Sequence, residues 1–208
     1  MDELRGLYAI TDPGLTPGQT LIDASAAALR GGAKILQYRD KNATDEERLY
    51  RATRLRQLCH EHRALFIIND DPRLAAACGA DGVHLGQQDG GIALARDLLG
   101  ARAIIGISCH GDLALAHQAQ QQGASYVALG RFFASRTKPQ APPASLDTLI
   151  AARHELRLPV VAIGGIRPDN AGQLIDAGAD AVAVIHGLFA SKDIEARARQ
   201  LSALFRPR

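Results

Sequence analysis

ALFIINDDPRLAAACGADGVHLGQQD, residues 64–89, is the stretch that decides the fold of this chain. It holds two short apolar runs, at 65–69 and 82–86, and between them a helical pattern that starts at Asp-Asp-Pro and ends at a glycine. A strand, a helix and a second strand in this order are typical of a parallel sheet. Asp70 follows the run at 65–69 and Asp89 follows the run at 82–86, so both carboxylates are expected at the carboxyl ends of strands.

The same alternation continues through the rest of the chain. Six further runs are strand candidates: LYAIT at 7–11, ILQYR at 35–39, AIIGIS at 103–108, YVALG at 126–130, VVAIGG at 160–165 and AVAVIH at 181–186. Eight strands close a parallel barrel, so the sequence predicts an α/β fold, a single (β/α)8 TIM barrel over residues 1–208. The alternative is a doubly wound open sheet, but the first run leads into DPGLTPGQ, which is no dinucleotide loop.

A weak internal repeat supports this unit. Each copy places a glycine where a helix closes, as a left-handed cap, directly before the next strand starts. The copies are Gly32-Ala33-Lys34, Gly79-Ala80-Asp81, Gly123-Ala124-Ser125 and Gly178-Ala179-Asp180.

The composition is that of a globular protein, with 47% hydrophobic and 22% charged residues in a chain of 208. The net charge of +2 comes from scattered basic residues, so no nucleic-acid partner is expected. Because no apolar stretch is long enough to span a bilayer and the first residues lack the layout of a signal peptide, we expect a cytoplasmic protein with no membrane partner. Cys59, Cys78 and Cys109 are expected to be buried or partly buried thiols, since their spacing fits neither a disulfide framework nor a zinc site.

The second run delivers Gln37, Arg39 and Lys41 in the sequence QYRDK. If the chain stays extended, period-two alternation points all three side chains in one direction. An arginine fork, a lysine charge and an amide on one side would clamp a diphosphate. The alternative is an ordinary solvated strand end.

The third and fourth runs predict a magnesium site. Asn69 and Asp70 end the third run and Asp89 follows the fourth, and Mg²⁺ prefers such oxygen ligands together with waters and substrate phosphates. The alternative for Asp70 is helix capping, because Asp-Asp-Pro is also a good helix start.

The fifth run ends in Ser108-Cys109-His110. Ser108 could act as a nucleophile and His110 as its base, but no carboxylate at a recognisable spacing completes a triad, which favours Ser108 as a positioning hydroxyl. His84, inside the fourth run, is interpreted as a packed histidine with satisfied hydrogen bonds.

The last three strand ends predict anion binding. The loop after the sixth run is rich in cations and hydroxyls, unless it is a plain polar turn, and continues into the Pro-rich stretch 138–145, whose length suggests a mobile flap over the segment 131–145. Glycine amides after the seventh run and a helix N-terminus after the eighth form the phosphate pocket that recurs in barrels. The residues concerned are Arg131, Ser135, Arg136, Thr137, Lys138, Gly164, Gly165, Ile185 and His186.

QYRDK, the NDD before a helix, HLGQ followed by an aspartate, ISCH, the loop ending in TK and AIGGI occur in the order found in one enzyme family. Over nearly its whole length the chain resembles the thiamine phosphate synthases. The resemblance implies a (β/α)8 barrel that joins a hydroxymethylpyrimidine diphosphate to a thiazole phosphate, releasing diphosphate with the help of Mg²⁺.

The resemblance also implies roles for individual residues. Asp70 and Asp89 would hold Mg²⁺, Ser108 would touch the pyrimidine, and Arg39, Lys41, Ser108 and Lys138 would be catalytic. The pyrimidine diphosphate would be bound by Gln37, Arg39, Lys41, Asn69 and Lys138. The thiazole phosphate would be bound by Ser135, Arg136, Thr137, Gly165, Ile185 and His186.

Four positions depart from the family pattern. Arg131 and Ala134 replace common prolines, Ser135 a common threonine and His186 a usual serine. Two alternative functions remain: a related thiazole tautomerase, which carries a histidine near position 131, and a non-catalytic phosphate-binding barrel. Both share phosphorylated small molecules as the expected partners, and a homo-oligomer is left open.

Overall fold

The computed structural model describes residues 4–135, 140 and 142–205. Its strands form one closed, all-parallel barrel in sequence order, with the last strand paired to the first. The strands are β1 (Gly6–Ile10), β2 (Ile35–Tyr38), β3 (Leu65–Asn69), β4 (Gly82–Leu85), β5 (Ile104–His110), β6 (Tyr126–Leu129), β7 (Val160–Ile163) and β8 (Ala181–Val184). The predicted (β/α)8 barrel is therefore confirmed, and the open sheet is excluded.

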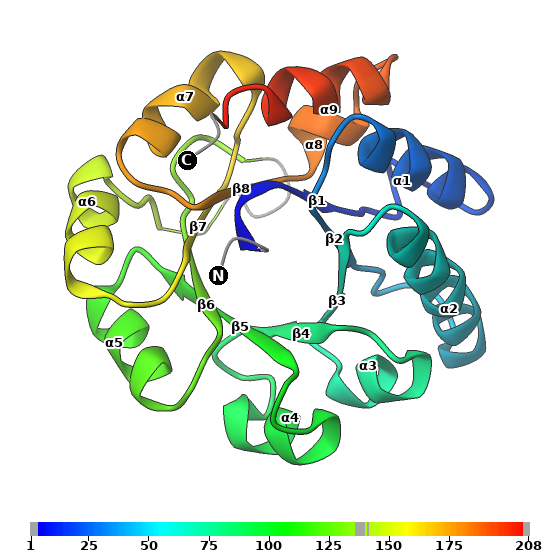
Figure 1. Ribbon diagram of the computed structural model, residues 1–208, viewed down its shortest axis with the longest axis horizontal. Coiled ribbons are helices and arrows are strands. Elements are labelled where there is room, and N and C mark those ends of the chain that lie inside the picture. The colour runs from blue at the N-terminus through cyan, green and yellow to red at the C-terminus, as the bar shows by residue number, and fades with distance from the viewer. Residues whose placement is uncertain (1–3, 136–139, 141, 206–208) are drawn as a thin grey trace.

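Helices surround the barrel on the outside (Figure 1). They are α1 (Thr20–Arg30), α2 (Asp45–Glu61), α3 (Pro72–Cys78), α4 (Gly91–Leu99), α5 (Leu113–Gln121), α6 (Leu146–Glu155), α7 (Pro168–Asp176), α8 (His186–Phe189) and α9 (Ile194–Ser202). Among the described residues, no helix combines the length and the apolar character that crossing a membrane would require.

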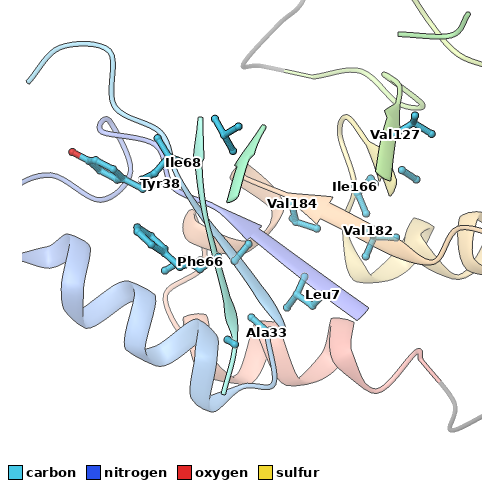
Figure 2. Close-up of a cluster of buried hydrophobic side chains, with 14 of the residues drawn as sticks. Leu7, Ala33, Tyr38, Phe66, Ile68, Val127, Ile166, Val182 and Val184 are labelled. Atoms are coloured by element: carbon cyan, nitrogen blue, oxygen red, sulfur yellow. The ribbon is translucent and has the colours of Figure 1, made fainter. Parts of the chain in front are cut away.

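The alternation of side chains along each strand creates two apolar clusters. In β1, Leu7 belongs to the outer cluster between strands and helices, whereas Tyr8 belongs to the inner cluster inside the barrel. Figure 2 shows part of the outer cluster, including Leu7, Phe66 and Val182. Phe66 is fully buried there, and truncating such a side chain to alanine costs about 3–5 kcal/mol of stability.

The predicted glycine repeat has a clear structural role. Its glycines have positive φ angles, as at Gly79 (67°) and Gly178 (107°), where a helix ends before the next strand. In three of the copies, the side chain of the residue two positions after the glycine accepts a hydrogen bond from a backbone amide near the start of the preceding strand. These bonds are Phe66 N to Asp81 (2.8 Å), Ile105 N to Ser125 (3.0 Å) and Val160 N to Asp180 (3.0 Å). The repeat thus ties neighbouring strands together at the amino end of the barrel.

The cysteines are free thiols, as predicted. Cys59 and Cys109 are buried and Cys78 is partly buried. Burial raises the pKa of all three thiols, which keeps them protonated at neutral pH.

Candidate active site

A cavity of about 350 Å³ opens at the carboxyl end of the barrel. Predicted site residues line it from strands β2, β3 and β5 and from the segments that directly follow β2, β6, β7 and β8. They are Gln37, Arg39, Asn69, Ser108, Ser135, Gly165, Ile185 and His186. One cavity therefore gathers residues that are up to 149 positions apart in the sequence, from 37 to 186.

Some predicted residues lie elsewhere. Arg136, Thr137 and Lys138 fall outside the described residues, so their predicted contacts and the closure of the segment 131–145 stay predictions. Lys41, Asp70 and Asp89 are not among the residues that line the cavity. They follow the ends of β2, β3 and β4, three neighbouring strands.

The extended conformation predicted through Lys41 is wrong, because β2 ends at Tyr38. The Asp40 side chain accepts from the amide of Asn42 (2.9 Å), which turns the chain. Lys41 consequently leaves the direction of Gln37 and Arg39, and its Nζ pairs with Asp70 Oδ2 at 3.0 Å.

Asp71, and not Asp70, caps the N-terminus of helix α3. Asp71 Oδ1 accepts from the amides of Arg73 (3.1 Å) and Leu74 (3.0 Å) at the start of α3. Asp70 has a left-handed backbone, with φ of 63°, and its amide donates to the His84 carbonyl at 2.8 Å. This geometry ties the end of β3 to β4 and leaves the Asp70 carboxylate for other ligands.

The two acids predicted to hold a metal do meet. The carboxyl groups of Asp70 and Asp89 lie within hydrogen-bonding reach of each other. Burial and the neighbouring Asp70 raise the pKa of Asp89, although Asp89 Oδ2 accepts from the Gly86 amide at 2.7 Å. Burial alone would raise the pKa of Asp70 as well, but hydrogen bonds with Lys41 and Asp89 bring it below the usual range.

This pair of oxygen donors fits a magnesium ion. Two adjacent carboxylates repel each other when both are charged, and a divalent cation between them removes that cost. The described part of the chain has no cluster of three or more histidine, cysteine or acidic residues able to hold a metal. Two protein carboxylates are nevertheless enough for Mg²⁺, which keeps several waters and takes phosphate oxygens.

Arg39 is held by a residue that the sequence reasoning missed. Its Nη1 lies 3.6 Å from Asp12 Oδ2, and its amide donates to the Thr11 hydroxyl at 2.9 Å. Asp12 could have been found, because it follows the first predicted strand just as Asp70 follows the third. The pairing helps to keep the guanidinium at the cavity wall, and the other oxygen of Asp12 accepts from the Gly14 amide at 3.0 Å.

Ser108 has a histidine partner, but it is His84 and not His110. The Ser108 hydroxyl lies 2.9 Å from His84 Nε2, and His84 Nδ1 lies 3.0 Å from the Tyr126 hydroxyl. His84 is thus buried and hydrogen bonded, as predicted, and it also lines the cavity. A tyrosine occupies the place where a hydrolytic triad has a carboxylate, which agrees with a positioning role for Ser108.

The opposite wall has the predicted glycine amides and a helix start. The strand predicted through His186 ends at Val184, and His186 instead begins the short helix α8. Gly165 has a φ of 64°, and a Cβ there would overlap Phe133 and Ala134, so only glycine fits. Asn170 Nδ2 donates to the Gly165 carbonyl at 3.1 Å, which orients this turn.

Comparison with known proteins gives one consistent result. The family model described as thiamine monophosphate synthase matches residues 7–188. The chain is 64% identical to the thiamine-phosphate synthase of Alcanivorax borkumensis over 99% of this chain and 96% of that one. It is 58% identical to that of Nitrosococcus oceani, covering 94% and 90% of the two chains.

A solved structure agrees with this result. The thiamine phosphate pyrophosphorylase of Pyrococcus furiosus superposes with a TM-score of 0.89 at 35% identity, covering 98% of this chain and 96% of that one. The chain therefore belongs to the thiamine monophosphate synthase family.

Proposed function

We propose that this transferase, which forms thiamine phosphate and releases diphosphate, joins its two substrates in the cavity at the carboxyl end of the barrel. The substrates are 4-amino-2-methyl-5-hydroxymethylpyrimidine diphosphate and hydroxyethylthiazole phosphate or its carboxylated form. The observation that carries the proposal is the convergence of eight predicted site residues on one cavity, with the acidic pair at the neighbouring strand ends.

The diphosphate would lie between Arg39, Lys41 and Mg²⁺. Arg39 lines the cavity and offers a planar pair of donors. In the structure Lys41 Nζ forms an ion pair with Asp70 Oδ2 at 3.0 Å. In the substrate complex Lys41 can turn from Asp70 to the phosphates, because its side chain is 60% exposed. Lys138, whose place in the sequence matches the family motif, would add a third basic side chain.

Asp70 and Asp89 would hold the magnesium ion, and Asn69 would bind the diphosphate beside it. The bound cation supplies positive charge that lowers the cost of releasing diphosphate. Asp70 directly follows β3, and the turn after the adjacent strand β4 carries Asp89, where its carboxylate accepts from the Gly86 amide at 2.7 Å, so both carboxylates lie close to neighbouring strand ends.

The reaction itself needs little proton transfer. The bond between the pyrimidine methylene carbon and the diphosphate oxygen breaks, and its electron pair leaves with the diphosphate. The electron-rich aminopyrimidine carries the resulting positive charge until the thiazole nitrogen donates its lone pair and forms the new carbon–nitrogen bond. With the carboxylated thiazole, the carboxylate would also leave as CO₂ and a proton from solvent would take its place on the ring carbon. Arg39, Lys41 and Lys138 would stabilise the departing charge, and Ser108 and Gln37 would hold the ring.

The thiazole phosphate would bind on the opposite wall. Gly165, Ile185 and His186 line the cavity there, and Ser135 joins them from the loop after β6. His186 stands where the family usually has serine, and an imidazole N–H can donate to a phosphate oxygen as a hydroxyl does. Arg136 and Thr137 would bind the thiazole phosphate as well, an assignment that rests on the family motif alone.

One assay tests the function. The purified chain is incubated with both phosphorylated substrates and Mg²⁺, and thiamine phosphate is sought by mass spectrometry, with each substrate alone as control. The proposal expects thiamine phosphate and an equal amount of diphosphate only when both substrates are present. Isomerisation of the thiazole alone would indicate a tautomerase, and binding without any product would indicate a non-catalytic barrel.

The proposed setting is the cytoplasm, with phosphorylated small molecules as partners and neither nucleic acid nor membrane. The net charge of +2 and the scattering of basic residues along the sequence support the absence of a nucleic-acid partner.

A further inference from the structure

Five side chains form a continuous hydrogen-bonded chain through the inside of the barrel. We call it the relay; its members, in order, are Gln37 (β2), Tyr8 (β1), Tyr126 (β6), His84 (β4) and Ser108 (β5). The successive distances are 2.7 Å from Gln37 Nε2 to Tyr8 Oη, 2.8 Å between the tyrosine hydroxyls, 3.0 Å from Tyr126 Oη to His84 Nδ1 and 2.9 Å from His84 Nε2 to Ser108 Oγ. Both ends of the relay, and His84, line the cavity.

The middle of the relay is buried and neutral. Tyr8 and Tyr126 are 1% and 0% exposed, and burial raises the pKa of both hydroxyls, so each keeps its single proton. Gly106 in β5 makes room for this arrangement, because a Cβ at that position would overlap the ring of Tyr126. The barrel interior is therefore shaped around the relay rather than filled by apolar side chains alone.

With Gln37 Nε2 facing Tyr8 Oη as the donor, a count of the available protons gives the relay one direction. The Gln37 amide nitrogen donates to Tyr8, so the single Tyr8 hydrogen is donated onward to Tyr126. Tyr126 in turn donates to His84 Nδ1, which leaves the histidine hydrogen on Nε2, pointing at Ser108. Ser108 accepts that bond, and its own hydrogen is left for the cavity. At the other end, the amide oxygen of Gln37 is left as an acceptor.

We propose that Tyr8, Tyr126 and His84 are positioning residues that lock Gln37 as an acceptor and Ser108 as a donor, so that the cavity selects a ring with an amine beside an acceptor nitrogen. An aminopyrimidine has this pattern: its amine donates to Gln37 and its ring nitrogen accepts from Ser108. The corresponding hydroxypyrimidine, in its oxo form, has a carbonyl acceptor beside a ring N–H. Its carbonyl would face the Gln37 acceptor and its ring N–H would face the Ser108 donor, so neither hydrogen bond could form. Rejecting such an analogue follows from leaving buried polar groups unpaired.

The opposite direction would have a different meaning. If Ser108 donated to His84 Nε2 and His84 Nδ1–H to Tyr126, Ser108 would be set up as in a serine nucleophile and Gln37 would present its NH₂ group. The two directions place the proton of neutral His84 on different ring nitrogens, Nε2 in the first and Nδ1 in the second. That proton can be observed directly.

Nitrogen-15 NMR of the histidines in the substrate-free protein decides the direction, with the His84 signal assigned by its loss in His84→Gln. The proposal expects neutral His84 protonated at Nε2, and in Tyr126→Phe a mixture of both tautomers. A wild-type His84 protonated at Nδ1 would overturn it. This measurement needs no substrate, so its result stands even if the proposed function fails in the product assay.

Kinetics tests the selectivity, which rests on the proposed function. In Tyr126→Phe we expect the KM for the aminopyrimidine diphosphate to rise roughly 10-fold, while the KM for the thiazole phosphate stays unchanged. The ratio of kcat/KM for the aminopyrimidine diphosphate to kcat/KM for the hydroxypyrimidine analogue should fall by a similar factor. Tyr38→Phe is the matched control, because Tyr38 is equally buried but belongs to the outer cluster of β2. Tyr8→Phe breaks the same relay and serves if Tyr126→Phe does not fold.

Two results would overturn the selectivity claim. One is a folded Tyr126→Phe or Tyr8→Phe enzyme whose KM and discrimination equal those of the wild type. The other is an equal change in Tyr38→Phe, which would show that loss of any buried hydroxyl has this effect. A wild-type protein that makes no thiamine phosphate would instead refute the proposed function, and the NMR result would then decide the relay alone.

Discussion

Two regions of the same barrel mouth are built in opposite ways. The charged rim, consisting of Asp12, Arg39, Lys41, Asp70 and Asp89, carries formal charges near solvent; Lys41 is 60% and Asp70 29% exposed. The relay directly below it carries no required charge and is almost wholly buried. The rim is held by ion pairs such as Lys41–Asp70, whereas the relay is held by hydrogen bonds between neutral groups.

The difference separates two tasks. Exposed ion pairs have small net energies and rearrange easily, so the rim can exchange its internal partners for a diphosphate and a cation. Buried hydrogen bonds are costly to break, so the relay keeps one geometry whether or not substrate is present. On this account the rim supplies the electrostatics of the reaction and the relay selects the ring. Variants in the two regions should consequently fail in different ways.

Asp89→Asn tests the rim most severely. The amide still accepts from Gly86 but lacks the charge for a cation, so we expect kcat to fall roughly 10²-fold or more with little change in thermal stability. Steady-state kinetics over a range of Mg²⁺ concentrations measures it. Asp71→Asn is the control, because it changes the neighbouring carboxylate, keeps a capping side chain and should keep its activity. Wild-type turnover in Asp89→Asn would refute the role of Asp89.

Arg39 distinguishes charge from geometry. Arg39→Gln removes both and is expected to lower kcat/KM roughly 100-fold, whereas Arg39→Lys keeps the charge without the planar fork and should lose roughly 10-fold. The same assay at several salt concentrations measures the effect. Equal losses of kcat/KM in Arg39→Lys and Arg39→Gln would show that the positive charge of Arg39 does not contribute to the reaction.

Gly106→Ala tests the packing around the relay. The added methyl group collides with Tyr126, so we expect a loss of about 1–3 kcal/mol in the free energy of unfolding, which for a chain of 208 residues lowers the melting temperature by about 2–12 °C. Thermal unfolding followed by circular dichroism measures it. Gly172→Ala is the control, because nothing lies within 4 Å of a Cβ at that helical position. Equal melting temperatures for both variants would show that Tyr126 moves aside freely.

Alkaline pH gives the smallest expected effect. Because burial raises the folded-state pKa of Tyr8 and Tyr126 above the unfolded value near 10, the folded protein holds protons that the unfolded chain releases. The stability that they contribute is complete below pH ~10 and decreases as pH rises further. Urea unfolding between pH 8 and 11 should show a shallower decrease in Tyr126→Phe than in the wild type, whereas identical slopes would contradict the neutral, buried state of Tyr126.

Except for Asp12, the residues of the rim could be predicted from sequence, whereas the two tyrosines that join the relay could not. Asp70 and Asp89 each follow a predicted strand, and barrel topology alone brings such strand ends together. Tyr8 and Tyr126 lie in the middle of apolar runs, where an aromatic residue usually indicates core packing. Their contact joins strands 118 residues apart in sequence and depends on how the barrel closes.

Local errors in the sequence analysis also have physical reasons. The strand predicted over 35–39, with an extended chain as far as Lys41, stops at Tyr38, and the side chain of Asp40 accepts from the amides of Asn42 and Ala43. The strand predicted through His186 stops at Val184 because Ile185 leaves the β region, with a ψ of −89°, and α8 begins. Both lie at strand ends, where side-chain hydrogen bonds and helix starts compete with the apolar pattern.

The most direct test of the division between rim and relay is the binding of Mn²⁺, in place of Mg²⁺, to the protein in the presence of inorganic diphosphate, followed by electron paramagnetic resonance. The account predicts about one bound Mn²⁺ in the wild type and in Tyr126→Phe, and none in the double variant Asp70→Asn/Asp89→Asn. Wild-type Mn²⁺ binding in the double variant, or its loss in Tyr126→Phe, would contradict the account.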